Sequence, residues 1–464
     1  MWIADARNNR VLLIQYNPPL VPTDPYLCPP APQSCNANYG SPVFGDPQFG
    51  IQYKNGVYPG FGSTIGVIGQ PNFTSKTQNL SRTGLEFPSG IGLDSSGNLW
   101  VVDQLNSRVL EFQASDIRAS NFKNGPAAQQ VIGAPDYTTA NDNPNAQSNN
   151  FGAPEAIAFD SGGNLYVSDT GNCRIMVFGH GDLGAGKPNQ PAARIVLGQS
   201  NFTSSCVIPT SGSVLGRVNG IAFDKSGNLW AASSTGVSEF TTQAQGVSGI
   251  NFQNGQMGTV VIPTGQILSS PFGVTFDPDG NLWVSDGCNL YLYCSNAYNR
   301  VIELKSGSWT PISILGQGSS PQTMPGDPTN SEANEGKGNP YPSTLASPNY
   351  LTFDSSKNLF VSDSGNNRVN EYDPVYAQTP PACSPGSVCV PCPKSAKFCL
   401  AQGTIYVGDN ATFIIGETNG YTVCNGLPEA PCPTDDNGLP IPSPPTKTTL
   451  NQPKGIIAIA GTGG

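Results

Sequence analysis

The sequence has little charge and almost no histidine, and both shortages narrow what the protein can do. Charged residues make up 12% of the 464 residues, about half of the usual share of roughly 25%. The formal net charge is −10 at pH 7 and no cluster of lysine and arginine occurs, so a nucleic-acid-binding surface is not expected. The single histidine, His180, lies in a glycine-rich loop and cannot build a metal site of several histidines. We therefore expect no metal and no cofactor.

Long apolar runs and several catalytic motifs are also missing. No run of about 18 or more apolar residues occurs, so no membrane span is expected. Neither a Gly-x-Ser-x-Gly motif nor a specific pair of carboxylates indicates a hydrolase. No signal peptide is recognisable. Because Met1 stands where the repeats described next have the leucine of Gly-Asn-Leu, we expect a leader to be missing from this chain.

The main feature that is present is an internal repeat, best seen in Pro348–Tyr372. Three short apolar runs there are separated by the turn signals DSSKN and DSGNN, which predicts an antiparallel meander of three strands. The chain opens with the second half of such a unit and closes with the first half, so there are six units. The other full copies are Pro88–Phe112, Pro154–Phe178, Val218–Phe240 and Pro271–Leu304.

A second signature, such as IVLGQSNFTS at 195–204, follows the meanders and predicts a fourth, outer strand. Since one unit is too small to bury its apolar face, six units must pack around a ring. We predict an all-β fold, a six-bladed β-propeller of four-stranded antiparallel blades with long disulfide-pinned loops. The N- and C-terminal strands share blade one and close the ring. In this single domain, 1–464, blade one comprises 1–69 and 452–464, and the others are 88–137, 154–204, 218–265, 271–318 and 348–417.

The repeated motifs Asp-x-x-Gly-Asn-Leu-[Trp/Tyr/Phe]-Val-x-Asp and Asp-x-x-Asn-x-Arg-[Val/Ile] resemble those of the NHL-repeat family of six-bladed β-propellers. The likeness runs through the whole chain and is of the type seen in secreted bacterial NHL-repeat proteins. Similar propellers include lyases of the amidating type, which use several histidines around a channel metal. The resemblance implies the fold, but His180 alone departs from what such a lyase needs.

We interpret the repeated acidic, basic and aromatic residues as structural. The first aspartate caps a tight turn whose glycine allows positive φ, with calcium binding as the alternative, and Lys357 replaces that glycine in blade six. The second aspartate should pair with the arginine, and blade four lacks both residues. The alternative is a ring of arginines that faces a ligand. The aromatic residues should form a core layer between blades, with a sugar-stacking platform as the alternative. The first aspartates are Asp94, Asp160, Asp224, Asp277 and Asp354. The aspartate–arginine pairs are Asp5–Arg10, Asp103–Arg108, Asp169–Arg174, Asp286–Arg300 and Asp363–Arg368. The aromatic residues are Trp100, Tyr166, Trp230, Trp283 and Phe360.

The second residue of each inner strand varies in chemistry and is our candidate for ligand binding. Inner strands line the central channel, and propeller ligands tend to bind at its mouth. We expect these residues to form a ring around one opening, in which Glu155 and Lys454 pair. A solvated rim without a ligand is the alternative. The six residues are Ser89, Glu155, Asn219, Phe272, Asn349 and Lys454.

The 12 cysteines lie mostly in loops and indicate an oxidising compartment. A zinc site is the alternative for the cluster Cys383, Cys389, Cys392 and Cys399, but its spacing is not a two-knuckle pattern, so we expect disulfides within the cluster. The other expected pairs are Cys28–Cys35, Cys173–Cys206, Cys288–Cys294 and Cys424–Cys432. Four sequon residues are candidates for glycosylation, with turn chemistry as the alternative: Asn72, Asn79, Asn201 and Asn410.

These observations favour an extracellular, non-enzymatic propeller that works as a binding or structural interaction module, with other proteins or glycans as partners. One alternative is a protomer of an extracellular filament or surface coat, joined to its own copies through terminal strands or loop excursions. A second alternative is a lyase or hydrolase at the channel mouth.

Overall fold

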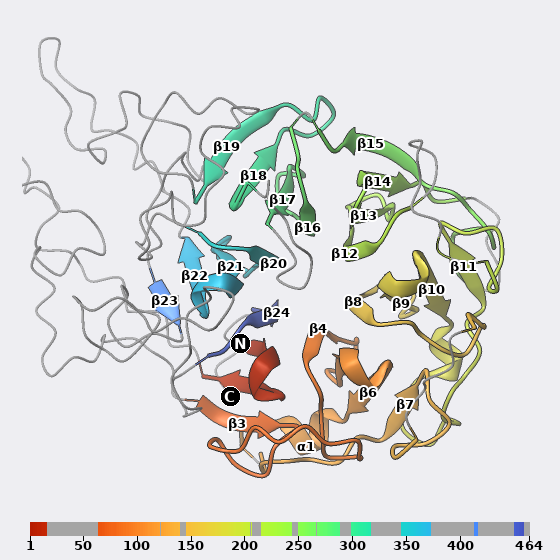
Figure 1. Ribbon diagram of the computed structural model, residues 1–464, viewed down its shortest axis with the longest axis vertical. Coiled ribbons are helices and arrows are strands. Elements are labelled where there is room, and N and C mark those ends of the chain that lie inside the picture. The colour runs from red at the N-terminus through yellow and green to blue at the C-terminus, as the bar shows by residue number, and fades with distance from the viewer. Residues whose placement is uncertain are drawn as a thin grey trace, which may run out of the picture.

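The computed structural model describes residues 1–15, 64–120, 122–139, 145–204, 206, 215–243, 249–265, 267–287, 298–316, 345–372, 413–415 and 450–458. Its strands form six antiparallel sheets of four strands each. The sheets stand as blades around a central channel (Figure 1). The predicted all-β, six-bladed propeller is therefore confirmed.

In each blade, the first strand named lies nearest the centre of the ring and the fourth lies at its outer edge. Blade one consists of β24 (Pro453–Ile457), β1 (Trp2–Asp5), β2 (Arg10–Ile14) and β3 (Thr64–Ile68). Blade two consists of β4 (Pro88–Leu93), β5 (Leu99–Asp103), β6 (Arg108–Phe112) and β7 (Gln130–Ile132). Blade three consists of β8 (Pro154–Phe159), β9 (Leu165–Asp169), β10 (Arg174–Phe178) and β11 (Ile195–Leu197).

The second half of the ring has the same order. Blade four consists of β12 (Val218–Phe223), β13 (Leu229–Ser233), β14 (Gly236–Phe240) and β15 (Thr259–Pro263). Blade five consists of β16 (Pro271–Phe276), β17 (Leu282–Asp286), β18 (Arg300–Leu304) and β19 (Pro311–Leu315). Blade six consists of β20 (Pro348–Phe353), β21 (Leu359–Asp363), β22 (Arg368–Tyr372) and β23 (Phe413–Ile415). Connections contain α1 (Ala114–Ile117) and the 3-10 turns η1 (Ala6–Asn8), η3 (Gln104–Asn106), η4 (Thr170–Asn172), η5 (His180–Asp182) and η8 (Ser364–Asn366).

Strands from both ends of the chain complete blade one. β24 pairs antiparallel with β1, so that Trp2 lies opposite Ile457 and Ile3 opposite Ile456. In Figure 1 the dark blue β24 lies beside the red strands of the N-terminal segment. This is the closure that the repeat pattern predicts, and it covers the edge of β1 that would otherwise be open.

The first turn of each meander is held by its aspartate. In blade two, Asp94 Oδ1 accepts the N–H groups of Ser96 at 2.9 Å and Asn98 at 3.0 Å, and Oδ2 accepts Trp100 Nε1 at 3.1 Å. The same ring-to-carboxylate bond forms from Tyr166 to Asp160, from Trp230 to Asp224 and from Trp283 to Asp277. All these rings are buried between blades, which confirms the core layer and excludes a sugar-stacking platform there.

Blade six keeps this turn although Lys357 stands at the glycine position. Lys357 adopts a left-handed φ of 69°, and its N–H donates to Asp354 O at 3.1 Å. The lysine is therefore strained in an unchanged turn, since non-glycine residues avoid positive φ.

The second turn is built on a buried aspartate–arginine pair. Arg108 Nε lies 2.7 Å from Asp103 Oδ2, and both side chains are inaccessible to solvent. The guanidinium also donates to carbonyl oxygens of Tyr137, Ser81 and Gly84. Burial raises the pKa of the Asp103 carboxyl, and the arginine opposes that rise. The pairs of blades one, three and six have the same geometry, whereas Arg300 lies 3.6 Å from Asp286. The predicted clamps are confirmed, and buried arginines do not form a ligand-facing ring.

The described loops between the third and fourth strands latch blades two to five to the blade before them. In the first of these latches, Asn124 Oδ1 accepts Val67 N at 3.3 Å, and Gly125 N donates to Val67 O at 2.9 Å. Blades three and four repeat this latch on Val131 through Asn189 and Gln190, and on Val196 through Asn254 and Gly255. Rings from three such loops cover an aromatic ring of the blade before: Phe122 on Trp2, Phe252 on Tyr166 and Trp309 on Trp230.

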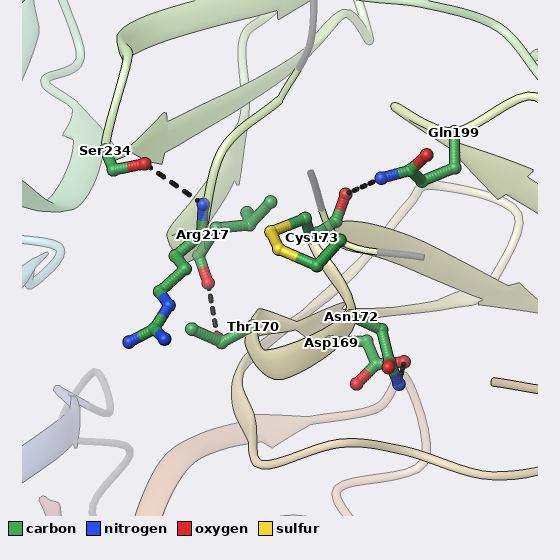
Figure 2. The surroundings of a disulfide bond; sticks show 9 residues. Asp169, Thr170, Asn172, Cys173, Gln199, Arg217 and Ser234 are labelled. Carbon is green, nitrogen blue, oxygen red and sulfur yellow. Dashed lines mark hydrogen bonds between the residues drawn. A yellow bond between two sulfur atoms is a disulfide. The ribbon is translucent and has the colours of Figure 1, made fainter. Parts of the chain in front are cut away.

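The joints between blades use one position of the second turn. Asn9 Oδ1 accepts the N–H of Phe87, the residue before β4, at 2.8 Å. Asn299 and Asn367 do the same to Ser347 and Gln452, each at 2.8 Å. In blade three this position is Cys173, which forms the predicted disulfide with Cys206 in the connection to blade four (Figure 2). A covalent bond thus stands where blades one, five and six use an asparagine.

The other predicted disulfide cysteines and the sequon residue Asn410 lie outside the described residues. Asn72, Asn79 and Asn201 are exposed. Asn72 Oδ1 accepts the N–H and hydroxyl of Thr74 at 3.0 and 2.9 Å. Asp136 makes the same turn with Thr138 in blade two, which shows that the position serves turn chemistry. Glycosylation stays a prediction.

Candidate functional site

The six candidate residues form a layer across the central channel. Ser89, Glu155, Phe272, Asn349 and Lys454 are buried, and Asn219 is partly buried. Each lies at the second position of its inner strand, as the repeat alignment predicts. The hypothesis placed them around an open mouth, whereas their burial shows a closed layer.

Glu155 is the centre of this layer. Its Oε1 lies 2.7 Å from Lys454 Nζ, so the expected pair forms, and the two side chains are 0% and 4% exposed. Gln104 Nε2 donates to Glu155 Oε2. The carbonyl oxygen of Glu155 accepts Ser89 Oγ at 2.8 Å and the Tyr350 hydroxyl at 2.7 Å. Residues of blades one, two and six thus converge on one residue of blade three.

Aromatic rings complete the surroundings of Lys454. Its ammonium lies 5.0 Å from the ring centroid of Phe87 and 5.5 Å from that of Phe272. Ring faces attract a cation, and this attraction adds to the ion pair in a buried site. A buried ion pair is retained only when such partners offset the loss of hydration.

Tyr350 separates the polar layer from the rest of the channel. The third residue of the other inner strands is Gly90, Ala156, Gly220, Gly273 or Gly455. A Cβ at Gly273, for example, would lie 2.2 Å from Asn349 O, because neighbouring inner strands approach closely. Blade six alone has a large residue there, and its ring packs edge-on against Phe272 at 5.7 Å. Burial and the Glu155 carboxylate raise the pKa of Tyr350, so its hydroxyl remains a donor.

Beyond Tyr350 lies a cavity of about 280 Å³, which we call the vestibule. Every inner strand contributes its fourth residue to the lining, and each of these residues is aliphatic. Thr275 and Thr352 add two hydroxyl groups, and no acidic or basic side chain lines the vestibule among the described residues. The aliphatic residues are Ile91, Ile157, Ile221, Val274, Leu351 and Ile456.

Sequence reasoning missed three parts of this site. Tyr350 breaks the small-residue pattern at its position, and that irregularity was a usable signal. The aliphatic fourth position was equally visible in the repeats. Gln104 had no signal, because its turn position differs in chemistry from blade to blade.

The described part of the chain contains no group of three or more His, Cys, Asp or Glu residues suited to a metal ion. His180 is exposed in η5 and does not line the vestibule. None of the helices in the described ranges has the length and hydrophobicity needed to cross a bilayer.

Comparisons with solved structures return matches at low identity. Virginiamycin B lyase from Staphylococcus aureus is 13% identical over 61% of this chain and 80% of its own, with a TM-score of 0.33. A gluconolactonase from Xanthomonas campestris is 13% identical over 62% and 72%, with a TM-score of 0.34. A chain of a nidogen–laminin complex is 16% identical over 65% and 81%, with a TM-score of 0.36. At these values the matches assign no function to this chain.

The sequence comparisons concern the repeat itself. A search of curated proteins found no significant match. The NHL repeat model matches residues 151–178, which contain β8, β9 and β10 of blade three. The same three-strand pattern, with its turn aspartate, recurs around the ring. The chain is therefore a six-bladed β-propeller whose blade three matches the NHL repeat model.

Proposed function

We propose that this propeller is a non-enzymatic binding module, acting outside the cell, that receives an uncharged apolar group in the vestibule. The observation that carries the proposal is the aliphatic ring of the six inner strands, closed on one side by Tyr350. An apolar pocket with a few polar groups at its edge is the usual form of a ligand site.

The size of the vestibule indicates what enters it. An apolar cavity of about 150 Å³ is sufficient for benzene. A volume of about 280 Å³ therefore accommodates one aromatic or branched aliphatic side chain. We favour a protein partner that inserts such a side chain, with the hydroxyl groups of Thr275 and Thr352 available to its backbone.

A lyase or hydrolase at this place has less support. The Glu155 carboxylate is already bound by Lys454 and Gln104, and it lies on the other side of Tyr350 from the vestibule. The filament alternative depends on loop excursions or on exchange of β24, and the native mass of the protein tests it. For the glycan partners expected from the sequence we favour a different surface, at the outer edge of the ring.

The proposal is tested with a neutral apolar fluorophore, N-phenyl-1-naphthylamine. We expect saturable binding to the purified full chain. Ala222 lines the vestibule and is partly exposed, so Ala222→Phe fills it and should abolish binding. Ala185→Phe, the same change at an exposed loop residue, is the matched control and should bind like wild type. Absence of saturable binding, or equal binding by Ala222→Phe, would overturn the proposal.

A further inference from the structure

A second cavity, of about 380 Å³, lies at the outer edge of the ring where blades one and two meet. We call it the rim cavity. The segment after β3 forms one wall, and the latch loop of blade two forms the other. Six uncharged, hydrogen-bonding side chains line it: Gln70, Ser75, Thr77, Asn79, Thr83 and Asn124.

Both walls of the rim cavity are held in place by hydrogen bonds. Gln70 is 2% exposed, and its Nε2 donates to the carbonyl oxygens of Asn9 at 2.9 Å and Thr77 at 2.8 Å. On the other wall, Asn124 and the adjacent Gly125 are tied to Val67 of β3. A site organised before binding loses less entropy when a ligand arrives.

Several polar groups at the cavity remain available. The hydroxyl of Thr77 and the side-chain amide of Asn79 have no hydrogen-bond partner within the described ranges. The same holds for Gln70 Oε1 and Asn124 Nδ2, because the bonds of these residues use their other amide atom. An amide presents a donor beside an acceptor, and a hydroxyl can act as either.

This chemistry fits a ligand that carries several neutral hydroxyl groups. Each sugar hydroxyl is a donor and an acceptor, and it matches amide and hydroxyl partners equally well. Among the described residues, no acidic or basic side chain lines the rim cavity, so an ion would lose hydration without gaining a counter-charge there. The ring of Pro71 adds a small apolar surface for the C–H face of a sugar.

We propose that the rim cavity binds one or two neutral sugar residues. This site is independent of the vestibule, so the two proposals can fail separately. The sugar has two conceivable sources, because Asn79 lines the cavity and also lies in the sequon Asn79-Leu80-Ser81. One source is a free saccharide, and the other is a glycan attached to the protein itself.

The first experiment uses protein from a host without N-glycosylation, checked by intact mass. Glucose, N-acetylglucosamine, maltose and cellobiose are tested by saturation-transfer NMR and calorimetry. We expect at least one to bind with a Kd of about 1 mM. Thr77→Val and Asn79→Leu each remove polar atoms at an exposed position and should weaken binding about five- to tenfold. Thr259→Val, at an exposed threonine of β15, should leave both binding and thermal unfolding unchanged.

Failure of all four sugars to bind, or wild-type affinity in both Thr77→Val and Asn79→Leu, would overturn the rim site. Tighter binding of glucuronate or glucosamine than of glucose would overturn its preference for neutral ligands. In a second arm the protein comes from a glycosylating host. A sugar on Asn79 that abolishes binding of the free saccharide supports the attached source, whereas unchanged binding contradicts the rim cavity as the site. If Asn79 is unmodified in this host and the protein still binds the free saccharide, the result supports a free saccharide as the ligand.

Discussion

Glu155 shows how one side chain can join distant parts of a ring. Lys454, Gln104 and Tyr350 come from three other blades, and all of them contact Glu155. The pair with Lys454 joins residues separated by 299 positions in the sequence. Removal of one charge would leave the other buried without a partner, which costs more than the pair contributes.

We therefore expect Glu155→Gln and Lys454→Met each to lower the free energy of unfolding by about 3–5 kcal/mol. The double variant should be less destabilised than the sum of the two single variants, because no charge is then left unpaired. Denaturant titration of the four proteins measures this coupling. Strictly additive losses would contradict a direct interaction.

Glu111 is a buried carboxyl of a different kind. It is 0% exposed, and neither carboxylate oxygen has a hydrogen-bond partner among the described residues. Burial, together with the charge of Asp94, raises the pKa of Glu111 from 4.5 to about 7. Blades one and three have Leu13 and Val177 at the corresponding position of the third strand.

The sign of the pH effect follows from this raised pKa. The folded state holds the proton more tightly than the unfolded state, so the contribution of Glu111 is intact below pH 4.5 and is lost as pH rises to about 7. We expect Glu111→Leu to remove that loss and to raise the free energy of unfolding at pH 8 by about 1–3 kcal/mol.

Denaturant titrations of wild type and Glu111→Leu between pH 4 and 8 measure the difference. Glu239→Leu is the control, because Glu239 occupies the same position in blade four but is partly exposed. The free energy of unfolding of Glu239→Leu at pH 8 should differ less from wild type than that of Glu111→Leu. A Glu111→Leu curve parallel to wild type throughout would show that Glu111 does not titrate in this range.

At the scale of elements, the meanders were predictable and the latches were not. Turn aspartates, glycines and asparagines act within a few residues of their own turn, so the sequence carries that information locally. The sequence does not indicate a role for the loops before the fourth strands. Their function depends on Val67, Val131 and Val196 of the preceding blade, which sequence spacing alone does not place beside them.

The joint between blades three and four offers a test of the asparagine position. Reduction of Cys173–Cys206 should lower stability by about 2–4 kcal/mol. The variant Cys173→Asn/Cys206→Ser should recover about 1 kcal/mol relative to Cys173→Ser/Cys206→Ser, because Asn9 accepts a linker N–H at the same position. Thermal unfolding of wild type and of the two double variants, with and without reductant, ranks their stabilities. Equal stability of the two double variants would show that asparagine does not substitute for the disulfide at this joint.

At the scale of the whole molecule, closure depends on the last strand. Removal of residues 452–464 takes away β24 and Lys454, and leaves β1 as an open sheet edge. Open edges promote association, so we expect the shortened chain to lose its cooperative transition and to aggregate.

Light scattering tests closure and the filament alternative together. The full chain should give discrete particles near its mass of 48.5 kDa, while the shortened chain should not. Regular polymers of the full chain would instead support a filament protomer. Added mass per subunit would direct attention to the sequons.

The sequence by itself determined the number of blades, the turn chemistry, the aspartate–arginine clamps and the sharing of blade one. Each of these depends on residues close together in a repeat, or on the order of the repeats. Only the tertiary structure decided that Gln104 and Tyr350 join the predicted Glu155–Lys454 pair, and that six aliphatic residues enclose a vestibule. The physical reason is that residues facing each other across the channel belong to different blades. Their contacts depend on the curvature of the closed ring and on side-chain direction, which repeat spacing does not contain.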